Sequence, residues 1–351
     1  MNIHEKYMLR CIELGKKGLG STAPNPMVGC VITKDDIIIG EGFTSAYGGA
    51  HAEVNAIASL KDKSLLKEAT LYVTLEPCSH YGNTPPCTDL IITHRIPKVV
   101  IGLEDPYEKV AGTGIKKLRA TGCEVTVGVL QEKCRALHKR FLTFQEKKRP
   151  YIVLKWAETW DGFIAPQPEK RSENRQPYWI SNLYSRQLTH QWRSEEQAIL
   201  VGTNTALQDN PKLNVRDWAG KNPIRVIIDR HLKIPQSLNV FSPDAKTIVI
   251  TEKKNLPKTT KTIVHYETVD FSGNLAEQIG AALHKHHISS VIVEGGSKTL
   301  QTFIDTGLWD EARIFRSRLS FGSGVTAPKI SGNVVKTKKI ATDQLTFLIN
   351  A

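Results

Sequence analysis

Apolar and polar positions along the first 144 residues follow an alternation of helix and strand. Apolar residues recur at helical spacing over residues 4–18, and two strand-length apolar runs (27–33 and 37–42) then flank the polar turn Lys34-Asp35-Asp36. This stretch predicts a helix followed by a β-hairpin. Further strands are expected at 70–75, 98–103 and 124–127, and further helices beginning near 51 and 87 and over 114–120 and 130–144. Two consecutive strand–helix units are typical of a sheet with helices on both faces.

The polar run over residues 145–150 breaks this alternation and marks the expected domain boundary. A new apolar strand covers 151–156, with further strands expected at 198–201, 224–228, 247–250 and 290–293 and a helix at 299–306. The segment 165–178 is rich in charges and in residues that break regular structure, so it is expected to be an exposed loop. A chain of 351 residues is long for one core. We therefore expect two domains, 1–147 and 148–351.

A split motif in the first domain carries the strongest chemical signal. His51 and Glu53 are two residues apart. Cys78 and Cys87 follow, with eight residues between them. One His and two Cys can give a tetrahedral zinc three protein ligands and leave the fourth position to water, which is the arrangement of a catalytic site. Zinc lowers the pKa of water toward neutrality, and Glu53 is then placed to pass a proton to a departing amine. The set predicts hydrolytic deamination.

The local structure expected around these residues suits the chemistry. His51 and Glu53 open an apolar-periodic helix. Cys78 follows an apolar strand, and Cys87 starts another helix, whose N-terminus favours the zinc-binding thiolate. Two alternatives remain open from the residues alone. One is a pair of buried thiols without metal, and the other is a zinc-stabilised, non-catalytic binding module, which would need a fourth protein ligand.

Composition restricts the compartment. The chain is 40% hydrophobic and 23% charged, and no stretch approaches the roughly 18 uninterrupted apolar residues of a membrane span. The N-terminus lacks the basic-then-apolar pattern of a secretory signal. All six cysteines lie in the first 140 residues, where a disulfide framework is not expected without an export signal. We therefore expect a cytoplasmic protein with no membrane partner.

The net charge of +12 is spread along the chain. Residues 1–150 carry 21 Lys and Arg against 16 Asp and Glu, and residues 151–351 carry 26 against 19. A nucleic-acid-binding protein usually concentrates its positive charge on one face or helix, so no nucleic-acid partner is expected. A diffuse positive surface also favours phosphorylated small molecules.

A strand that ends in a glycine turn is the main candidate site of the second domain. The apolar run that begins at Ser290 ends in Glu294-Gly295-Gly296, and a helix is expected after it. Backbone N–H groups at such a turn can approach a phosphate at a helix N-terminus, although this is not the GxGxxG fingerprint. Arg193 could bind a phosphate through two hydrogen bonds. From these residues alone, a simple strand–helix connection and a surface charge are the ordinary interpretations.

Taken together, the motifs of both halves resemble the bifunctional riboflavin-biosynthesis deaminase/reductase family along nearly the whole chain. The deaminase half of the resemblance rests on the segments 23–29 (APNPMVG), 51–53 (HAE) and 76–87 (EPCSHYGNTPPC). The eight-residue gap between the cysteines is the specific part, because cytidine and tRNA adenosine deaminases have two residues there. The reductase half rests on Lys155 and the segments 161–162 (DG), 179–181 (WIS), 199–202 (ILVG) and 293–296 (VEGG).

The resemblance implies an α/β protein with an N-terminal cytidine-deaminase-like three-layer α/β/α domain and a C-terminal dihydrofolate-reductase-like α/β domain. The first domain would be a zinc-dependent deaminase and the second an NADPH-dependent reductase. The first reaction is hydrolytic deamination of 2,5-diamino-6-ribosylamino-4(3H)-pyrimidinone 5′-phosphate at the ring carbon that carries the 2-amino group. The ribosylamino group then opens to an imine, and NADPH gives a hydride to the sugar C1′, which yields the ribityl compound.

The resemblance also assigns residues position by position. In the deaminase half it implies His51, Cys78 and Cys87 as ligands of one zinc ion, Glu53 as the proton shuttle, and Asn25, His80 and Asp105 as substrate contacts. In the reductase half it implies an NADPH site formed by Ala157, Trp179, Thr205, Asp209, Gly296, Ser297, Lys298, Thr299, Leu300, Gln301 and Thr302. It implies that Arg193, Leu213, Arg216 and Glu294 face the phosphorylated substrate, with the arginines suited to its phosphate.

Four positions depart from the pattern of the family. Thr44 stands where a His is frequent, and Asn83 stands where a Lys or Arg is frequent. Both positions are expected to contact the deaminase substrate, so its phosphate is expected to be held differently in this chain. Pro177 replaces a usual Ser near a reductase loop that looks several residues longer, and Arg230 occupies a small-hydroxyl position near the cofactor. These departures point to altered kinetics, with one impaired half-reaction as the alternative.

A zinc-dependent tRNA or nucleoside deaminase is the alternative within the same chemistry. It predicts a C-x-x-C pair, and it leaves the reductase motifs of the second half unexplained. The family resemblance further implies a homodimer or higher homo-oligomer that forms through the reductase domain.

Overall fold

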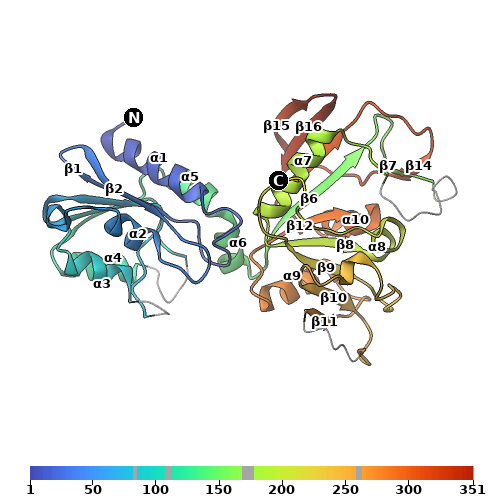
Figure 1. The fold of residues 1–351 in the computed structure, drawn as a ribbon, viewed down its shortest axis with the longest axis horizontal. Helices are drawn as coiled ribbons and strands as arrows, with labels where there is room; N and C mark the ends of the chain where they lie inside the picture. The colour runs from blue at the N-terminus through green and yellow to red at the C-terminus, as the bar shows by residue number, and fades with distance from the viewer. Residues whose placement is uncertain (82–84, 107–111, 168–177, 258–262, 351) are drawn as a thin grey trace. The chain divides into compact units, whose positions relative to one another are not determined.

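The chain folds into two compact units, which are described separately. The computed structural model describes residues 1–81, 85–106, 112–167, 178–257 and 263–350. One unit is Met1–Lys148 and the other is Arg149–Ala351, and both are drawn in Figure 1. The division therefore falls within the polar run that follows residue 144. Over the described residues, no helix combines the length and apolar character needed to cross a membrane.

The first unit is built on a five-stranded sheet with the order β2-β1-β3-β4-β5. Its strands are β1 (Gly29–Lys34), β2 (Ile37–Phe43), β3 (Thr70–Val73), β4 (Lys98–Ile101) and β5 (Glu124–Val127). Strand β1 is antiparallel to both β2 and β3, whereas β3, β4 and β5 run parallel. Residues of β1, β3 and β4 are almost all buried, as expected of strands that helices cover on both sides.

Helices cover both faces of this sheet. They are α1 (Ile3–Lys16), α2 (Ala52–Ala58), α3 (Cys87–Thr93), α4 (Thr113–Ala120), α5 (Gln131–Leu137) and α6 (Lys139–Lys147), with a short 3₁₀ helix, η1 (Lys63–Glu68). Figure 1 shows α1 and α5 against one face and α3 and α4 against the other. Helix α1 begins at a capping box in which the Asn2 side chain accepts from Glu5 N–H and Glu5 accepts from Asn2 N–H. This is the three-layer α/β/α arrangement predicted from the sequence.

The helix expected over residues 130–144 is instead divided into two. Leu130 has a positive φ of 54° and precedes α5, so the helix starts one residue later. Buried His138 separates α5 from α6, and its Nε2 lies 3.1 Å from Thr74 Oγ1. This contact holds the chain at the break. The sequence did not reveal the break, because it depends on a residue that is distant in the chain.

The second unit is built on a nine-stranded sheet with the order β11-β10-β9-β8-β12-β6-β13-β16-β15. Its strands are β6 (Tyr151–Glu158), β8 (Ala198–Gly202), β9 (Ile224–Ile228), β10 (Thr247–Thr251), β11 (Val264–Thr268), β12 (Ser290–Gly295), β13 (Glu311–Arg316), β15 (Asn333–Ile340) and β16 (Asp343–Ile349). The strands from β11 to β13 run parallel, and β16 and β15 add an antiparallel edge. A separate pair joins β7 (Phe163–Pro166) to β14 (Gly324–Thr326).

Two hydrophobic clusters fill this unit, in agreement with the α/β class predicted for it. The helices are α7 (Leu183–Glu195), α8 (Thr203–Asp209), α9 (Leu275–Lys285) and α10 (Ser297–Asp305), with a short 3₁₀ helix, η3 (Asn239–Phe241). Alternate residues of the parallel strands belong to different clusters: Leu200 packs with Trp156 in one, and Val201 packs with Trp192 in the other. Since successive side chains of a strand point to opposite faces, the two clusters lie on the two sides of the sheet.

Helix α7 was not among the helices expected from the sequence. Its buried side includes the polar residues Ser185 and Thr189 beside Trp192, so the apolar period is weak. A local start signal is present, because the Asn182 side chain accepts from Ser185 N–H at 3.0 Å. The expected loop over 165–178 is also partly wrong, since residues 165–166 belong to β7, which pairs with β14.

Candidate functional site

Three elements of the first unit bring the predicted zinc ligands together. His51 is the residue that precedes α2, and Cys87 is the first residue of α3. Cys78 lies in the loop that follows β3, where its Sγ accepts from Cys87 N–H at 3.3 Å. Within the described parts of the chain, these three residues form the group of His, Cys and carboxylate side chains that could hold a metal ion.

The spacing of the three donor atoms fits a tetrahedral zinc ion. His51 Nδ1 lies 3.6 Å from Cys78 Sγ and 3.3 Å from Cys87 Sγ, and all three donor atoms lie within 4.8 Å of one another. Ordinary Zn–S and Zn–N bond lengths at a tetrahedral angle separate sulfur from nitrogen by about 3.6 Å. The Cys87 thiol lowers the pKa of Cys78, while that contact and burial raise the pKa of Cys87. Zinc binds cysteine as the thiolate, so a cation held here would take the place of the thiol protons.

Glu53 lies next to this cluster in the first turn of α2 and is 3% exposed. Burial, with the neighbouring charge of Cys78, raises the pKa of the carboxyl group to about 7. The Cys87 side chain has a smaller, opposite effect and lowers this pKa. A buried carboxyl group with this pKa can both accept and release a proton near neutral pH.

Glu76 organises the loops around the cluster, a function that the sequence motif did not reveal. Its buried carboxylate accepts from the backbone N–H groups of Asp105 (3.2 Å), Gly112 (3.0 Å), Gly114 (2.9 Å) and Ile115 (3.1 Å). These bonds join the segment before Cys78 to the start of α4 and to the loop after β4. The available signal was an acidic residue directly after a buried strand, where a carboxylate needs hydrogen-bond partners.

The predicted substrate contacts of the first unit are accessible to different degrees. Asn25 and Asp105 are half-buried, and His80 is exposed. Thr44, in contrast, is buried, and its hydroxyl accepts a hydrogen bond from Val28 N–H at 3.1 Å. Thr44 therefore supports the chain directly before β1. Asn83 lies outside the described residues. The assignment of Asn25, His80 and Asp105 to the substrate remains a prediction.

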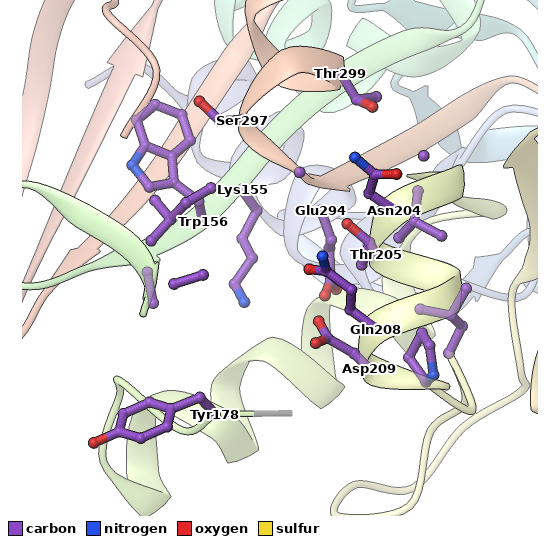
Figure 2. Close-up of a pocket in the computed structure, with 18 of the residues that line it drawn as sticks. Lys155, Trp156, Tyr178, Asn204, Thr205, Gln208, Asp209, Glu294, Ser297 and Thr299 are labelled. Carbon is purple, nitrogen blue, oxygen red and sulfur yellow. The ribbon is translucent and has the colours of Figure 1, made fainter. Parts of the chain in front are cut away.

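The second unit contains a cavity of about 660 Å³ at the carboxyl ends of its parallel strands. Strands β6, β8, β9 and β12 contribute to it, together with α7, α8 and the start of α10. Figure 2 shows Lys155 across this space from Thr205, Gln208 and Asp209 of α8, with Tyr178 at another side of the cavity. The carboxyl edge of an open parallel sheet is where such folds bind their ligands.

Most of the residues predicted for the reductase site line this cavity. They are Ala157, Trp179, Arg193, Thr205, Asp209, Leu213, Arg216, Glu294, Gly296, Ser297, Lys298 and Thr299. Three others lie elsewhere. Leu300 is fully buried in a hydrophobic cluster, Gln301 bonds to Asp305 and to Lys329 O, and the Thr302 hydroxyl bonds to Lys298 O. These three follow the first turn of α10, so their side chains leave the cavity.

A buried ion pair lies at the wall of the cavity. Arg193 donates to Glu294 through Nε at 2.7 Å and through a terminal nitrogen at 2.6 Å. Burial raises the pKa of Glu294, but the charges of Arg193 and Lys155 outweigh this effect and lower it to about 2. Burial lowers the pKa of Lys155, which Glu294 partly restores. The cavity therefore presents an ionised carboxylate beside a lysine that is less basic than usual.

The start of α10 can receive an anion. Gly296 precedes the helix and supplies no side-chain cap, so the first N–H groups are not satisfied by a side chain of that residue. A Cβ atom at Gly202 would lie 2.4 Å from Thr299 Oγ1, so a larger residue there would force the Thr299 hydroxyl to move. Helix N-termini bind phosphate groups through such N–H groups.

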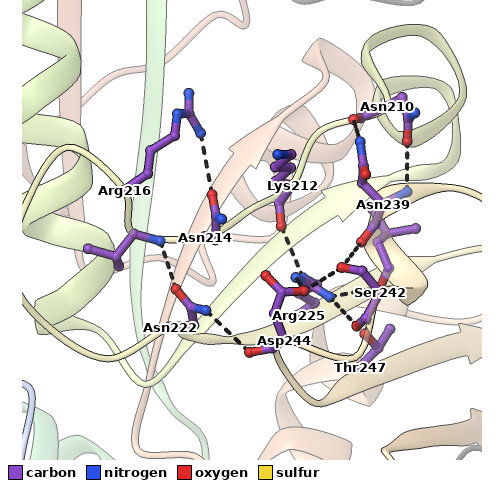
Figure 3. Close-up of polar contacts among 12 residues, drawn as sticks. Asn210, Lys212, Asn214, Arg216, Asn222, Arg225, Asn239, Ser242, Asp244 and Thr247 are labelled. Atoms are coloured by element: carbon purple, nitrogen blue, oxygen red, sulfur yellow. Dashed lines mark hydrogen bonds and ion pairs between the residues drawn. The ribbon is translucent and has the colours of Figure 1, made fainter.

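The loop that carries Leu213 and Arg216 is held by a buried arginine (Figure 3). Arg225 in β9 is 0% exposed and donates to Lys212 O (3.1 Å), Ser242 O (2.9 Å) and Asp244 Oδ1 (2.5 Å). Asn222 continues the network by accepting from Val215 N–H and donating to Asp244 O. The part of the cavity wall formed by Pro211, Lys212, Leu213 and Arg216 therefore depends on Arg225.

Several cavity residues were missed in the sequence. Arg186 lies two turns and His190 one turn before Arg193 on α7, so these residues share one face of the helix. That polar spacing was the available signal. Arg230, predicted as a departure near the cofactor, lines the cavity, pairs with Glu252 at 2.7 Å and lies 5.4 Å from the Phe271 ring. Pro177 lies outside the described residues.

Comparison with known proteins covers both units. The sequence model of the cytidine and deoxycytidylate deaminase zinc-binding region matches residues 1–103. The model of the RibD C-terminal domain matches residues 150–346. The first match contains the His51–Cys78–Cys87 cluster, and the second contains the cavity.

Full-length relatives share both units. The chain is 40% identical to the riboflavin biosynthesis protein RibD of Aquifex aeolicus, over 92% of this chain and 89% of the relative. It is 34% identical to RibD of Escherichia coli, over 91% and 89%. A deaminase/reductase structure from Thermotoga maritima matches with a TM-score of 0.88 at 40% identity, and Acinetobacter baumannii RibD matches with 0.89 at 30%, each over 99% of both chains. The chain thus belongs to the RibD family of bifunctional deaminase/reductases of riboflavin biosynthesis.

Proposed function

We propose that this chain deaminates 2,5-diamino-6-ribosylamino-4(3H)-pyrimidinone 5′-phosphate and then reduces its ribosyl group to ribityl with NADPH. The observation that carries the first step is the three-donor cluster of His51, Cys78 and Cys87 beside the buried carboxyl group of Glu53. The second step is supported by the cavity at the carboxyl edge of the second sheet. We assign the deaminase to residues 1–147 and the reductase to residues 148–351.

In the deaminase step, His51, Cys78 and Cys87 would hold one zinc ion, which activates water for attack on the amidine-like ring carbon. Glu53 takes the proton released by the attacking water and delivers it to the departing amine. The burial of Glu53 suits this function, because it raises the pKa of the carboxyl group to near the pH of the medium. Burial also excludes competing water. Asn25, His80 and Asp105 would bind the substrate around this centre.

In the reductase step, the start of α10 and the residues Ala157, Trp179, Thr205 and Asp209 would bind NADPH. NADPH bound there would supply a hydride to C1′ of the open-chain imine, and the imine nitrogen would gain a proton. Lys155 is suited to supply that proton, since it lines the cavity and burial lowers its pKa. Glu294 would contact the sugar hydroxyls while its pairing with Arg193 keeps it ionised.

The partners follow from the same chemistry. The ligands are small phosphorylated molecules. We propose no nucleic-acid partner, because the positive charge is spread along the sequence and a tRNA deaminase would not need a reductase unit. We also propose a cytoplasmic location and a homodimer or higher homo-oligomer formed through the reductase unit.

The test is an assay of purified protein that follows ammonia release and NADPH oxidation separately. We expect ammonia without NADPH, and NADPH oxidation only once the deaminated product is present. Ammonia release without any later NADPH oxidation would show that the reductase half is impaired. Arg230 would then be the first residue to replace by the small hydroxyl residue that is usual in the family. If neither signal appears with zinc bound, the proposed function is wrong.

A further inference from the structure

Glu76 is a buried acidic residue of the first unit to which the proposed reaction assigns no step. It is 4% exposed and lies two residues before the zinc ligand Cys78. A carboxylate is costly to bury unless hydrogen bonds compensate it. The compensation comes from backbone N–H groups of a segment that begins about thirty positions later in the chain. The side chain therefore connects the Cys78 loop to a second part of the site.

One oxygen of Glu76 caps helix α4. The usual cap of a helix N-terminus is a Ser, Thr, Asp or Asn directly before the helix. In α4 that position is Gly112, which has a φ of 68° and no side chain, and the first turn contains no acidic residue. Glu76 Oε1 accepts instead from Gly114 N–H at 2.9 Å and from Ile115 N–H at 3.1 Å. Glu76 thus supplies, from another strand end, the cap that the local sequence lacks.

The other oxygen of Glu76 connects this helix start to Asp105. Glu76 Oε2 accepts from Asp105 N–H at 3.2 Å and from Gly112 N–H at 3.0 Å. Gly114 permits this close approach, because a Cβ atom there would collide with Pro77 O. Asp105 is a predicted contact of the deaminase substrate, so the Glu76 carboxylate fixes the backbone at that contact.

The zinc ligand Cys78 is held by different contacts. Its carbonyl oxygen accepts from Thr88 N–H at 3.1 Å, and its Sγ accepts from Cys87 N–H at 3.3 Å. Both donors belong to the first turn of α3. A change at Glu76 should therefore release Asp105 and the start of α4 while the zinc ligands keep their positions.

We propose that Glu76 is a positioning residue of the deaminase, which acts through Asp105 and the start of α4 on substrate binding and not through the zinc ligands. This inference rests on the proposed function, because it takes Asp105 to contact the pyrimidine. Glutamine is the appropriate probe, since it keeps the size of the side chain but offers one acceptor oxygen in place of two. Two of the four N–H groups would then lose their acceptor.

The test measures ammonia release by wild-type protein, Glu76→Gln, Asp105→Ala, the double variant and the control Asp62→Asn. Asp62 is an exposed cap of η1 that accepts from Ser64 N–H at 2.9 Å. In Glu76→Gln we expect KM for the diaminopyrimidine to rise by roughly 10- to 100-fold, as for a lost charged hydrogen bond. Its kcat and zinc content should match those of wild-type protein and the control. In the Asp105→Ala background, Glu76→Gln should lower kcat/KM by much less than it does alone.

Hydrogen exchange of the zinc-loaded proteins gives a second measurement, which does not depend on turnover. In wild-type protein, the amides of residues 112–115 should exchange more slowly than those in the first turn of α5, because Leu130 before α5 makes no side-chain cap. Glu76→Gln should accelerate exchange at Asp105 and at residues 112–115 but not in α3. The wild-type comparison holds even if a variant does not fold.

Four results would overturn the proposal. KM could be unchanged in Glu76→Gln, or kcat and zinc content could fall together. The effect of Glu76→Gln could be equally large with and without the Asp105 side chain, or residues 112–115 of wild-type protein could exchange as fast as the start of α5. Any of these results in a protein that releases ammonia defeats this inference alone. If zinc-loaded wild-type protein releases no ammonia, the proposed function fails and this inference fails with it.

Discussion

Replacing Arg225 by Met is expected to destabilise the reductase unit strongly while leaving the deaminase unit folded. Arg225 is 0% exposed, and its guanidinium satisfies the carbonyl oxygens of Lys212 and Ser242 and the carboxylate of Asp244 (Figure 3). Met retains most of the side-chain volume, so the loss of hydrogen bonds is separated from the creation of a cavity.

The size of the effect follows from these contacts. Each carbonyl group left without a donor in a buried site costs about 1–3 kcal/mol. Asp244 is 41% exposed and can be solvated again, so its contribution is small. The total is about 3–5 kcal/mol, and in a unit of this size it should lower Tm by roughly 10 °C.

The assay is calorimetric unfolding together with separate measurement of both activities. The reductase transition should shift, and the KM of the reductase substrate should rise, because residues 211–216 of the cavity wall lose their support. The deaminase rate should not change, since that unit has its own core. Arg318→Ala, at an exposed arginine, is the control. If Arg225→Met unfolds at the same temperature as this control, the reasoning is refuted.

Three further predictions concern the two sites. Glu53→Gln should lower the rate of deamination by about 10²- to 10⁴-fold while zinc, measured by elemental analysis, remains bound; an unchanged rate with zinc present would support a non-catalytic zinc module. Cys87→Ala should abolish zinc binding and deamination and leave NADPH oxidation with the deaminated substrate intact; retention of one zinc per chain would show that Cys87 is not a ligand. The pKa of Glu294 falls from an ordinary 4.5 to about 2 in the fold, so its stabilising effect is complete above pH 4.5 and is lost as pH falls toward 2. Acid unfolding of the reductase unit over this window should therefore be less steep in Glu294→Gln, and an identical profile would contradict the assignment.

The first unit was largely predictable from its sequence, because the apolar residues of its strands and helices recur at a regular period. The hairpin, the parallel strands, the helix that follows His51 and the helix that begins at Cys87 lie where the pattern placed them. The break at His138 was not predictable, since it depends on a contact with Thr74 far away in the sequence.

The second unit was less predictable, since its functional surface is built from polar residues on helices and loops. The buried side of α7 includes Ser185 and Thr189, so no apolar stripe marks the helix that carries Arg186 and Arg193. The pairing of Arg193 with Glu294 joins residues about a hundred positions apart, and only the fold brings them together. Sequence motifs named both residues but could not show that they bind each other.

The most direct test of the account is one incubation of the purified chain with the diaminopyrimidine substrate, ¹⁸O-labelled water and NADPH that carries deuterium at its transferable position. If one chain catalyses both steps, the ribityl product should contain one ¹⁸O at the deaminated ring carbon and one deuterium at C1′. A product that lacks the ¹⁸O label would contradict hydrolytic deamination by the first unit, and a product that lacks deuterium at C1′ would contradict hydride transfer by the second.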